Sequence, residues 1–451
     1  MNKINIVSIV FVLISLFITS IDYLGFINLS DYFLMSIRWI TIFSLCIYAF
    51  NKKSLTTWIF ISMIIGIEFG YDFPELAVSL KVLSKIFLKL IKTIIAPLLF
   101  ATLVVGIAGH SNLKQIGRMG IKSLIYFEIV TTLALFIGLF AINISKAGVG
   151  INLPKSEHLE KLPEVKQQTF SDILLHIFPE NIAKSVAEGQ VLQIVIFSII
   201  FGIALAMVNE NHRKPIIELC EGLSEVMFKF TSIVMLFAPI GVGAAMAYTV
   251  GHMGLSVLFN LFKLLATLYI ALIIFILIVL IPIALIIKLP IKNFTKAIIE
   301  PVSIAFATTS SDAALPKAME KLEKFGIPRK IIAFVLPTGY SFNLDGTTLY
   351  LALASVFVAQ AAGIEMSFGT QIIMLLTLMI TSKGVAGVPR ASLVILLGTA
   401  TSFGLPVEPI FIILGIDELM DMARTSVNVI GNCLASAVIA KWEGELDFNK
   451  V

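Results

Sequence analysis

Long, uninterrupted apolar runs separated by short polar loops occupy the first two thirds of the chain. They fall at roughly 6–24, 33–50, 57–71, 86–109, 121–146, 189–208, 222–250 and 257–287. A helix that crosses the hydrocarbon core of a bilayer needs about 20 apolar residues, and most of these runs approach or exceed that length. Apolar and polar residues do not alternate within them, as they would in the strands of a membrane barrel. The pattern therefore predicts a bundle of membrane-spanning helices.

Composition and loop charge agree with a polytopic membrane protein. Of the 451 residues, 58% are hydrophobic and 14% are charged, with a net charge of +4. A typical soluble protein has roughly 25% charged residues, so a soluble enzyme, a disordered scaffold and a nucleic-acid-binding protein are disfavoured. Lysine and arginine gather in alternate loops, for example at 52–53 and 114–122. By the positive-inside rule these loops are cytoplasmic, which predicts an inner-membrane protein with both termini in the cytoplasm.

From residue 297 onward, polar residues interrupt the apolar pattern at four places. The interruptions lie at 308–316, 339–347 and 382–390, and along the predicted last helix, 409–441. The first and third contain Ser, Gly or Pro and predict the tips of re-entrant hairpins, because the flanking runs are short. The second predicts an unwound helix whose carbonyl groups line a cavity. Such paired interruptions in two halves indicate a secondary transporter built from inverted repeats.

The predicted last helix carries a stripe of polar side chains. Its members are Asp417, Asp421, Arg424, Thr425, Asn428 and Asn432. Residues three and four apart share one helix face, so all six should point the same way. Charges inside a bilayer are costly and normally face a wet or protein-lined site, which favours a binding site. The alternative is a structural Asp421–Arg424 pair that locks two helices together.

Four motifs, in this order, resemble those of the dicarboxylate/amino acid:cation symporters, which include the glutamate and aspartate transporters. They are Thr309-Ser310-Ser311 with Leu315-Pro316, Asn343-Leu344-Asp345-Gly346-Thr347, Gly384 with Gly387-Val388-Pro389, and Asp421-Met422-Ala423-Arg424-Thr425 with Asn428. The resemblance covers roughly 57–445. It implies an all-α fold with eight core transmembrane helices, two re-entrant hairpins and inverted repeats. It also implies a homotrimer in which a transport domain moves by an elevator mechanism.

The expected domain organisation follows from this resemblance. Residues 1–55 would form two extra N-terminal transmembrane helices, which the family core lacks. Residues 56–445 would form the symporter domain, with the hairpins and the binding core at 297–441. Residues 446–451 would be a cytoplasmic tail.

The resemblance also implies which residues bind substrate. They are Ser311, Thr347, Gly387, Val388, Asp421, Arg424, Thr425 and Asn428. Arg424 would bind the side-chain carboxylate of the substrate, because a guanidinium can contact a carboxylate through two parallel hydrogen bonds. Asp421 would bind the substrate ammonium. For each residue the alternative role is polar packing between helices. Arg390, at the second hairpin tip, could pair with an aspartate, reach the substrate or extend toward water.

Cation ligands implied by the resemblance are Thr131, Thr132, Gly339, Ser341, Asn343, Asp345, Asn428 and Asn432. Asn432 stands where the family usually has a carboxylate, and a neutral amide attracts a hard cation less strongly. Glu128 stands where sodium-coupled relatives can have tyrosine, and a membrane-embedded glutamate can carry a proton. We therefore expect co-transport of protons, of sodium bound at these cation sites, or of both, and no other cofactor.

The function predicted from the sequence is uptake of L-glutamate and L-aspartate, with no enzymatic activity. The alternative substrate is a C4-dicarboxylate such as succinate, fumarate or malate, which offers no ammonium to Asp421. An ion channel is disfavoured because it needs no Arg-Asp-Asn face. A membrane enzyme is disfavoured because no nucleophile–base pair or metal cluster accompanies the polar stripe. The expected partners are the acidic substrate, the lipid bilayer and two further copies of the chain, and no nucleic acid.

Overall fold

The computed structural model describes residues 3–108, 113–151, 178–188, 191–382 and 391–446, and these residues form helices and no β-strand. The predicted all-α class is therefore confirmed. Within these residues six helical stretches are long and apolar enough to cross a membrane, and the broken pair at 210–253 counts as a seventh if it is one span. This is the architecture of a multi-pass membrane protein. The number of core helices and the domain boundaries stay predictions.

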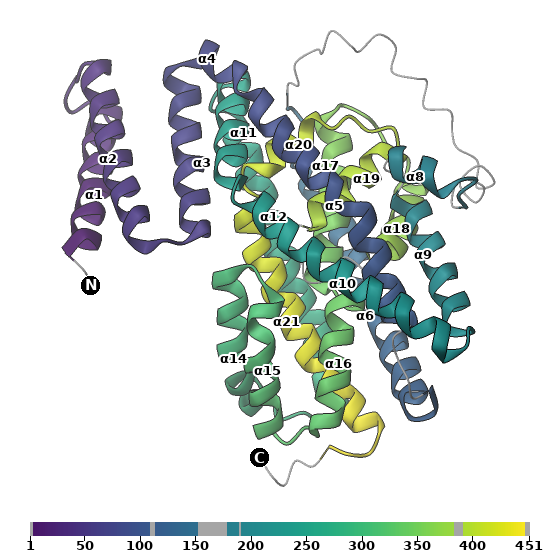
Figure 1. Ribbon diagram of the computed structural model, residues 1–451. Helices are drawn as coiled ribbons and strands as arrows, with labels where there is room; N and C mark the ends of the chain where they lie inside the picture. Colours follow the sequence, from purple (N-terminus) through teal and green to yellow (C-terminus); the bar gives the residue numbers. More distant parts are fainter. Residues whose placement is uncertain (1–2, 109–112, 152–177, 189–190, 383–390, 447–451) are drawn as a thin grey trace. The chain divides into compact units, whose positions relative to one another are not determined.

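The chain divides into two compact units, which are described separately. The first contains residues 1–90, 233–259 and 414–418, and the second contains 91–232, 260–413 and 419–451. Helices of the first unit are α1 (Lys3–Tyr23), α2 (Asp31–Lys52), α3 (Leu55–Asp72), α4 (Pro74–Ser79), the start of α5 (Lys81–Ala108), and α11 (Ala238–Met253). The two extra helices predicted at the N-terminus are thus α1 and α2, and they pack against each other (Figure 1).

Small residues let α3 and α11 approach each other closely. A Cβ added to Gly66 of α3 would lie 2.2 Å from the backbone oxygen of Gly243 of α11. One turn further along α3, a Cβ added to Gly70 would lie 2.6 Å from the backbone oxygen of Ala247. In a membrane, helix pairs gain most of their association energy from such close van der Waals contact.

The second unit contains most of the remaining helices. They are α6 (Leu113–Ser145), α8 (Ile182–Glu188), α9 (Val191–Ala206), α10 (Glu210–Met235), α12 (Val257–Phe275), the π-helical turn at Ile276–Leu280, α13 (Ile281–Ile286), α14 (Ile291–Thr308), α15 (Ser311–Lys324), α16 (Arg329–Phe342), α17 (Asp345–Ala361), α18 (Phe368–Thr381), α19 (Ala391–Ser402), α20 (Glu408–Leu414) and α21 (Asp417–Trp442).

Helix α17 forms the core of this unit. Every one of its residues except Gln360 is buried. Helix α6 packs along it so closely that a Cβ added to Gly138 would lie 2.3 Å from the backbone oxygen of Leu349. Helices α16 and α18 also pack against α6, and α17 contacts both arms of the second hairpin, α18 and α19. Helix α17 is thus buried on all sides and lies at the centre of this unit rather than at its surface.

The first two predicted interruptions coincide with breaks between helices. The first lies between α14 and α15, which pack side by side (Figure 1). There Thr309 takes the left-handed conformation, with φ 52°, and the Ser310 hydroxyl accepts a hydrogen bond from the Ala313 N–H at 3.3 Å. Such a serine is a favoured N-cap and fixes the start of α15. The second interruption separates α16 from α17 at Asn343 and Leu344.

The third predicted interruption falls between α18 and α19, which pack against each other. The tip itself, with Gly387, Val388 and Arg390, lies outside the described residues.

Two sequence predictions of single helices were wrong. The run 222–250 is divided between α10 and α11, and the chain leaves the helical conformation at Leu236 and Phe237. Pro239 explains the break, because proline lacks an N–H and is best placed in the first turn of a new helix. The last helix, expected over 409–441, is interrupted at Gly415 and Ile416 and becomes α20 and α21. Glycine is a common helix breaker because it restricts the backbone least.

Candidate functional site

The polar stripe lies entirely on α21, and its members Asp421, Arg424, Thr425, Asn428 and Asn432 are all buried. Arg424 is 1% exposed, so its charge must be balanced inside the protein. Its Nε donates a hydrogen bond to Asp421 Oδ1 at 2.9 Å. The Thr425 hydroxyl donates to the same oxygen, also at 2.9 Å. Three members of the stripe thus form one hydrogen-bonded group.

An aromatic ring completes the surroundings of Arg424. The guanidinium carbon lies 4.2 Å from the centroid of the Tyr350 ring, which is within the range of a cation–π contact. Tyr350 was not among the predicted site residues. The sequence did contain a signal, because Tyr350 follows Thr347 by three residues on one helix and therefore shares its face. The positive charge of Arg424 is held between a carboxylate and an aromatic face.

Asn428 joins α21 to the first turn of α17. Its Oδ1 accepts hydrogen bonds from the backbone N–H groups of Gly346, at 2.8 Å, and Thr347, at 3.2 Å. Its Nδ2 donates to the Thr347 hydroxyl at 2.9 Å. The first N–H groups of any helix lack partners within the helix, so Asn428 supplies a cap from a distant part of the chain. Asn428 and Thr347 were both predicted near the substrate, and the structure brings them together.

A glycine makes this junction possible. A Cβ added to Gly346 would lie 2.3 Å from the backbone oxygen of Arg424, a distance that no larger residue could occupy without moving the backbone. The backbones of α17 and α21 therefore touch where the broken helix resumes. This contact places Thr347 and Arg424 beside each other.

A second polar cluster surrounds the break between α16 and α17. Asn343 Nδ2 lies 3.2 Å from Asp345 Oδ2 and 3.3 Å from Asn432 Oδ1. Asn432 Nδ2 in turn donates to the backbone oxygen of Asn343 at 3.3 Å. All three side chains are fully buried, and Asn343 Oδ1 has no hydrogen-bond partner within the described part of the chain. A buried group of oxygen atoms around one carboxylate is the kind of site that binds a hard cation.

Glycines again leave room for these side chains. A Cβ on Gly431 of α21 would lie 1.9 Å from Asp345 Oδ2, and one on Gly339 of α16 would lie 2.0 Å from Asn432 Oδ1. The backbone oxygen of Gly339 accepts the Asn343 N–H at 2.7 Å, which closes the last turn of α16. The structure thus groups four predicted cation ligands: Gly339, Asn343, Asp345 and Asn432.

The other predicted cation ligands are placed differently. The buried Thr131 hydroxyl donates to the backbone oxygen of Phe127 on its own helix at 2.6 Å. The Thr132 hydroxyl donates to Met379 Sδ at 3.4 Å. Ser341 lies in the last turn of α16, and its side chain is outside the description. Both threonine hydroxyls thus have partners outside the cluster around Asp345.

Among the remaining predicted substrate ligands, Ser311 opens α15 and is partly exposed. Its N–H belongs to a helix N-terminus, which favours an anion. Gly387 and Val388 belong to the undescribed tip. The structure thus groups Thr347, Asp421, Arg424, Thr425 and Asn428.

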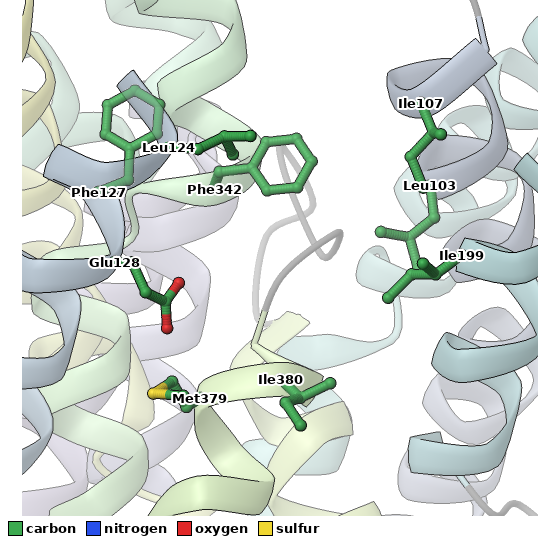
Figure 2. Close-up of a pocket in the computed structure, with 9 residues that line it drawn as sticks. All are labelled: Leu103, Ile107, Leu124, Phe127, Glu128, Ile199, Phe342, Met379 and Ile380. Atoms are coloured by element: carbon green, nitrogen blue, oxygen red, sulfur yellow. The ribbon is translucent and has the colours of Figure 1, made fainter. Parts of the chain in front are cut away.

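Glu128 of α6 faces an otherwise apolar cavity of about 320 Å³ (Figure 2). The other lining residues are Leu103, Ile107, Leu124, Phe127, Ile199, Phe342, Met379 and Ile380. They come from five helices of the second unit: α5, α6, α9, α16 and α18. Phe127 precedes Glu128 directly and lies 3.5 Å, at its Cζ, from a Cβ added to Gly339. The cavity wall therefore adjoins the last turn of α16, which contains Gly339 of the predicted cation site.

Comparison with known proteins shows the family. The sequence model of the sodium:dicarboxylate symporter family matches residues 55–442. A proton/sodium-glutamate symport protein of Bacillus caldotenax is 43% identical over 409 residues, which cover 89% of this chain and 97% of that protein. A proton/glutamate-aspartate symporter of Escherichia coli (strain K12) is 41% identical over 415 residues, 88% of this chain and 95% of that protein.

A third relative has a different name. A C4-dicarboxylate transport protein of Laribacter hongkongensis (strain HLHK9) is 40% identical over 405 residues, which cover 88% of this chain and 92% of that protein. Relatives named for two substrate classes are thus almost equally similar to this chain. The match of the family model extends over all four motifs, from the Ser-rich turn to α21. The chain belongs to the sodium:dicarboxylate symporter family.

Proposed function

We propose that this chain is a secondary active symporter that takes up L-glutamate and L-aspartate with protons, sodium ions or both. The observation that carries the proposal is the buried Asp421–Arg424 pair on α21, beside Thr347 and Asn428. An acidic amino acid has one ammonium and two carboxylates, and this group offers one carboxylate, one guanidinium, two hydroxyls and an amide. The names of the two most similar relatives described above support the same substrate class.

Binding would exchange the internal ion pair for two pairs with the substrate. The substrate ammonium would bind Asp421, and its side-chain carboxylate would bind Arg424 with help from the Thr347 hydroxyl. Thr425 would hold Asp421 in place through its existing hydrogen bond. Both buried charges keep an opposite partner throughout, which avoids the large cost of leaving one uncompensated. Asn428 and the backbone at Ser311, Gly387 and Val388 would hold the α-carboxylate.

The C4-dicarboxylates are the second candidate class, because a relative of that name is 40% identical. A dicarboxylate would compete with Asp421 for Arg424 and would bring no cation to Asp421. Two carboxylates would then share one guanidinium in a buried site, and like charges at close range are strongly disfavoured. The presence of Asp421 therefore favours the amino acids.

The coupling ion would compensate the charge of the substrate. Sodium would bind at the cluster of Gly339, Asn343, Asp345 and Asn432, with Thr131, Thr132, Ser341 and Asn428 as further ligands. Because the position of Asn432 supplies an amide and not a carboxylate, we favour the proton as the main coupling ion, carried by Glu128. The wider proposal follows the family: a homotrimer in the cell membrane, cytoplasmic termini, an elevator mechanism and no enzymatic activity.

Uptake into proteoliposomes tests this proposal directly. Radiolabelled aspartate, glutamate and succinate are offered with an inward proton gradient or an inward sodium gradient, each imposed alone. We expect aspartate and glutamate to compete with each other, and uptake to follow the proton gradient. Strict dependence on sodium with no response to pH would refute proton coupling. Succinate uptake that aspartate does not inhibit would refute the amino acid assignment.

A single substitution separates the two substrate classes. Asp421→Ala removes the proposed ammonium ligand, so aspartate uptake should fall much more than any succinate uptake. Ser426→Ala on the same helix is the matched control, because its hydroxyl bonds only to the Met422 backbone among the hydrogen bonds described. An equal loss for both substrates would indicate that Asp421 only supports the helix packing.

A further inference from the structure

The two N-terminal helices lie outside the part of the chain that matches the family. The match begins at residue 55, the first residue of α3. Helix α1 packs on α2, and α2 packs on α3. The contact between α2 and α3 therefore joins this added hairpin to the family core.

An ion cluster joins the N-terminal part of α2 to the C-terminal end of α3. Glu68 and Asp72 are four residues apart on α3 and so share one face. The Arg38 guanidinium of α2 bonds to both carboxylates, through Nε to Glu68 and through Nη2 to Asp72 Oδ1 at 3.0 Å. The neighbouring Trp39 indole donates to Asp72 Oδ2 at 2.8 Å. Both oxygens of Asp72 are thus engaged by α2, and its side chain is only 6% exposed.

A second contact joins the C-terminal end of α2 to the N-terminal end of α3. The rings of Phe50 and Trp58 meet edge to face with centroids 4.8 Å apart. Arg38 and Phe50 are twelve residues apart, which corresponds to about 18 Å along a helix. Helix α2 is therefore fastened to α3 at two widely separated points, one ionic and one aromatic.

We propose that the acidic face of α3 is a docking surface for a guanidinium-bearing helix, and that Arg38 makes the added hairpin an obligatory part of the core. Two carboxylates four residues apart within a membrane-spanning segment repel each other and resist transfer out of water. Arg38 compensates both. Loss of Arg38 alone would leave them uncompensated, which is more damaging than loss of the whole ion cluster.

Thermal unfolding of the full-length purified protein tests this dependence. We expect Arg38→Met to lower the melting temperature by at least about 5 °C, because two carboxylates lose their partly buried partner. The triple variant Arg38→Met, Glu68→Gln, Asp72→Asn should melt closer to the wild type than Arg38→Met does. Lys52→Met is the matched control, because it removes an exposed cation from the same helix.

The melting temperatures of these variants can also contradict the proposal. Arg38→Met indistinguishable from Lys52→Met would overturn it, and so would a triple variant no more stable than Arg38→Met. If Arg38→Met does not accumulate in membranes, recovery of the protein in the triple variant supports the proposal, and failure of both overturns it.

Cross-linking in membranes tests the aromatic contact independently. In a background with Cys46, Cys220 and Cys433 replaced by alanine, a short bifunctional thiol reagent should rapidly join Phe50→Cys to Trp58→Cys. Phe43 lies seven residues before Phe50 on α2, about 10 Å along the helix, so Phe43→Cys with Trp58→Cys is the control pair and should react slowly. Equal rates for the two pairs would show that α2 is not held on α3.

Discussion

Asn428→Ala should damage both the stability and the transport activity of the protein. The side chain is 3% exposed and makes three hydrogen bonds to the start of α17, at 2.8, 3.2 and 2.9 Å. Alanine would leave the buried N–H groups of Gly346 and Thr347 without this acceptor. Each unsatisfied buried donor costs about 1–3 kcal/mol, part of which a water molecule could recover.

The expected total is about 2–4 kcal/mol, or roughly a 30-fold to 1000-fold change in an equilibrium constant. This range applies to the folding equilibrium; the concentration for half-maximal aspartate uptake should also rise, because Asn428 is a proposed ligand of the substrate α-carboxylate. The melting temperature of the substrate-free protein should fall in parallel, because the cap is part of the fold. Proteoliposome uptake and thermal unfolding in detergent measure the two effects.

Two further variants give the prediction its controls. Asn428→Asp keeps an oxygen acceptor for the two N–H groups but loses the donation to the Thr347 hydroxyl, so its effect on stability should be smaller than that of alanine. Ser426→Ala keeps the three bonds and should change little. If Asn428→Ala matches Ser426→Ala in both uptake and melting temperature, the proposed cap has no energetic importance.

Three other substitutions have expected outcomes. Arg424→Lys keeps the charge but loses the planar fork, so the concentration for half-maximal uptake should rise at least tenfold; an unchanged value would mean that Arg424 does not bind a carboxylate. Glu128→Gln should abolish uptake driven by a proton gradient, and continued proton-driven uptake would exclude Glu128 as the carrier. Gly431→Ala should displace Asp345, because the added Cβ would lie 1.9 Å from its Oδ2. The variant should lose about 1–3 kcal/mol of stability, so its melting temperature should fall, and its cation-dependent uptake should fall as well. Uptake with a normal dependence on the ion would refute this.

Features that interrupt a regular pattern could be predicted from the sequence. The turn at Thr309 and Ser310 and the break at Asn343 place small and polar residues within apolar runs, where a continuous membrane helix would not have them. The stripe on α21 was predictable because residues three and four apart share one face of any helix, whatever packs against that face. These local signals were enough for the all-α class and for the group around Arg424.

Features that depend on distant packing could not be predicted. Hydropathy does not mark the end of α10, because the chain remains apolar through Leu236 and Phe237; the signal for that break is the local Pro239. The cap of α17 by Asn428 joins residues 81 and 82 positions apart, and no local pattern encodes it. The spacing of Tyr350 from Thr347 indicates a shared helix face, but it does not indicate that the ring contacts Arg424. Periodicity indicates which face of a helix is buried and does not say which side chain it meets.

The contacts at Gly346, Gly431 and Gly339 bear on how the protein could tell similar solutes apart. Each of these glycines brings α16, α17 or α21 against its neighbour with no spare space. Because these three helices are in close contact, a bound solute cannot enlarge its site by pushing them apart. A molecule one methylene longer must be accommodated by other parts of the protein. Discrimination between aspartate and glutamate would then follow from chain length, even though both molecules present the same charges.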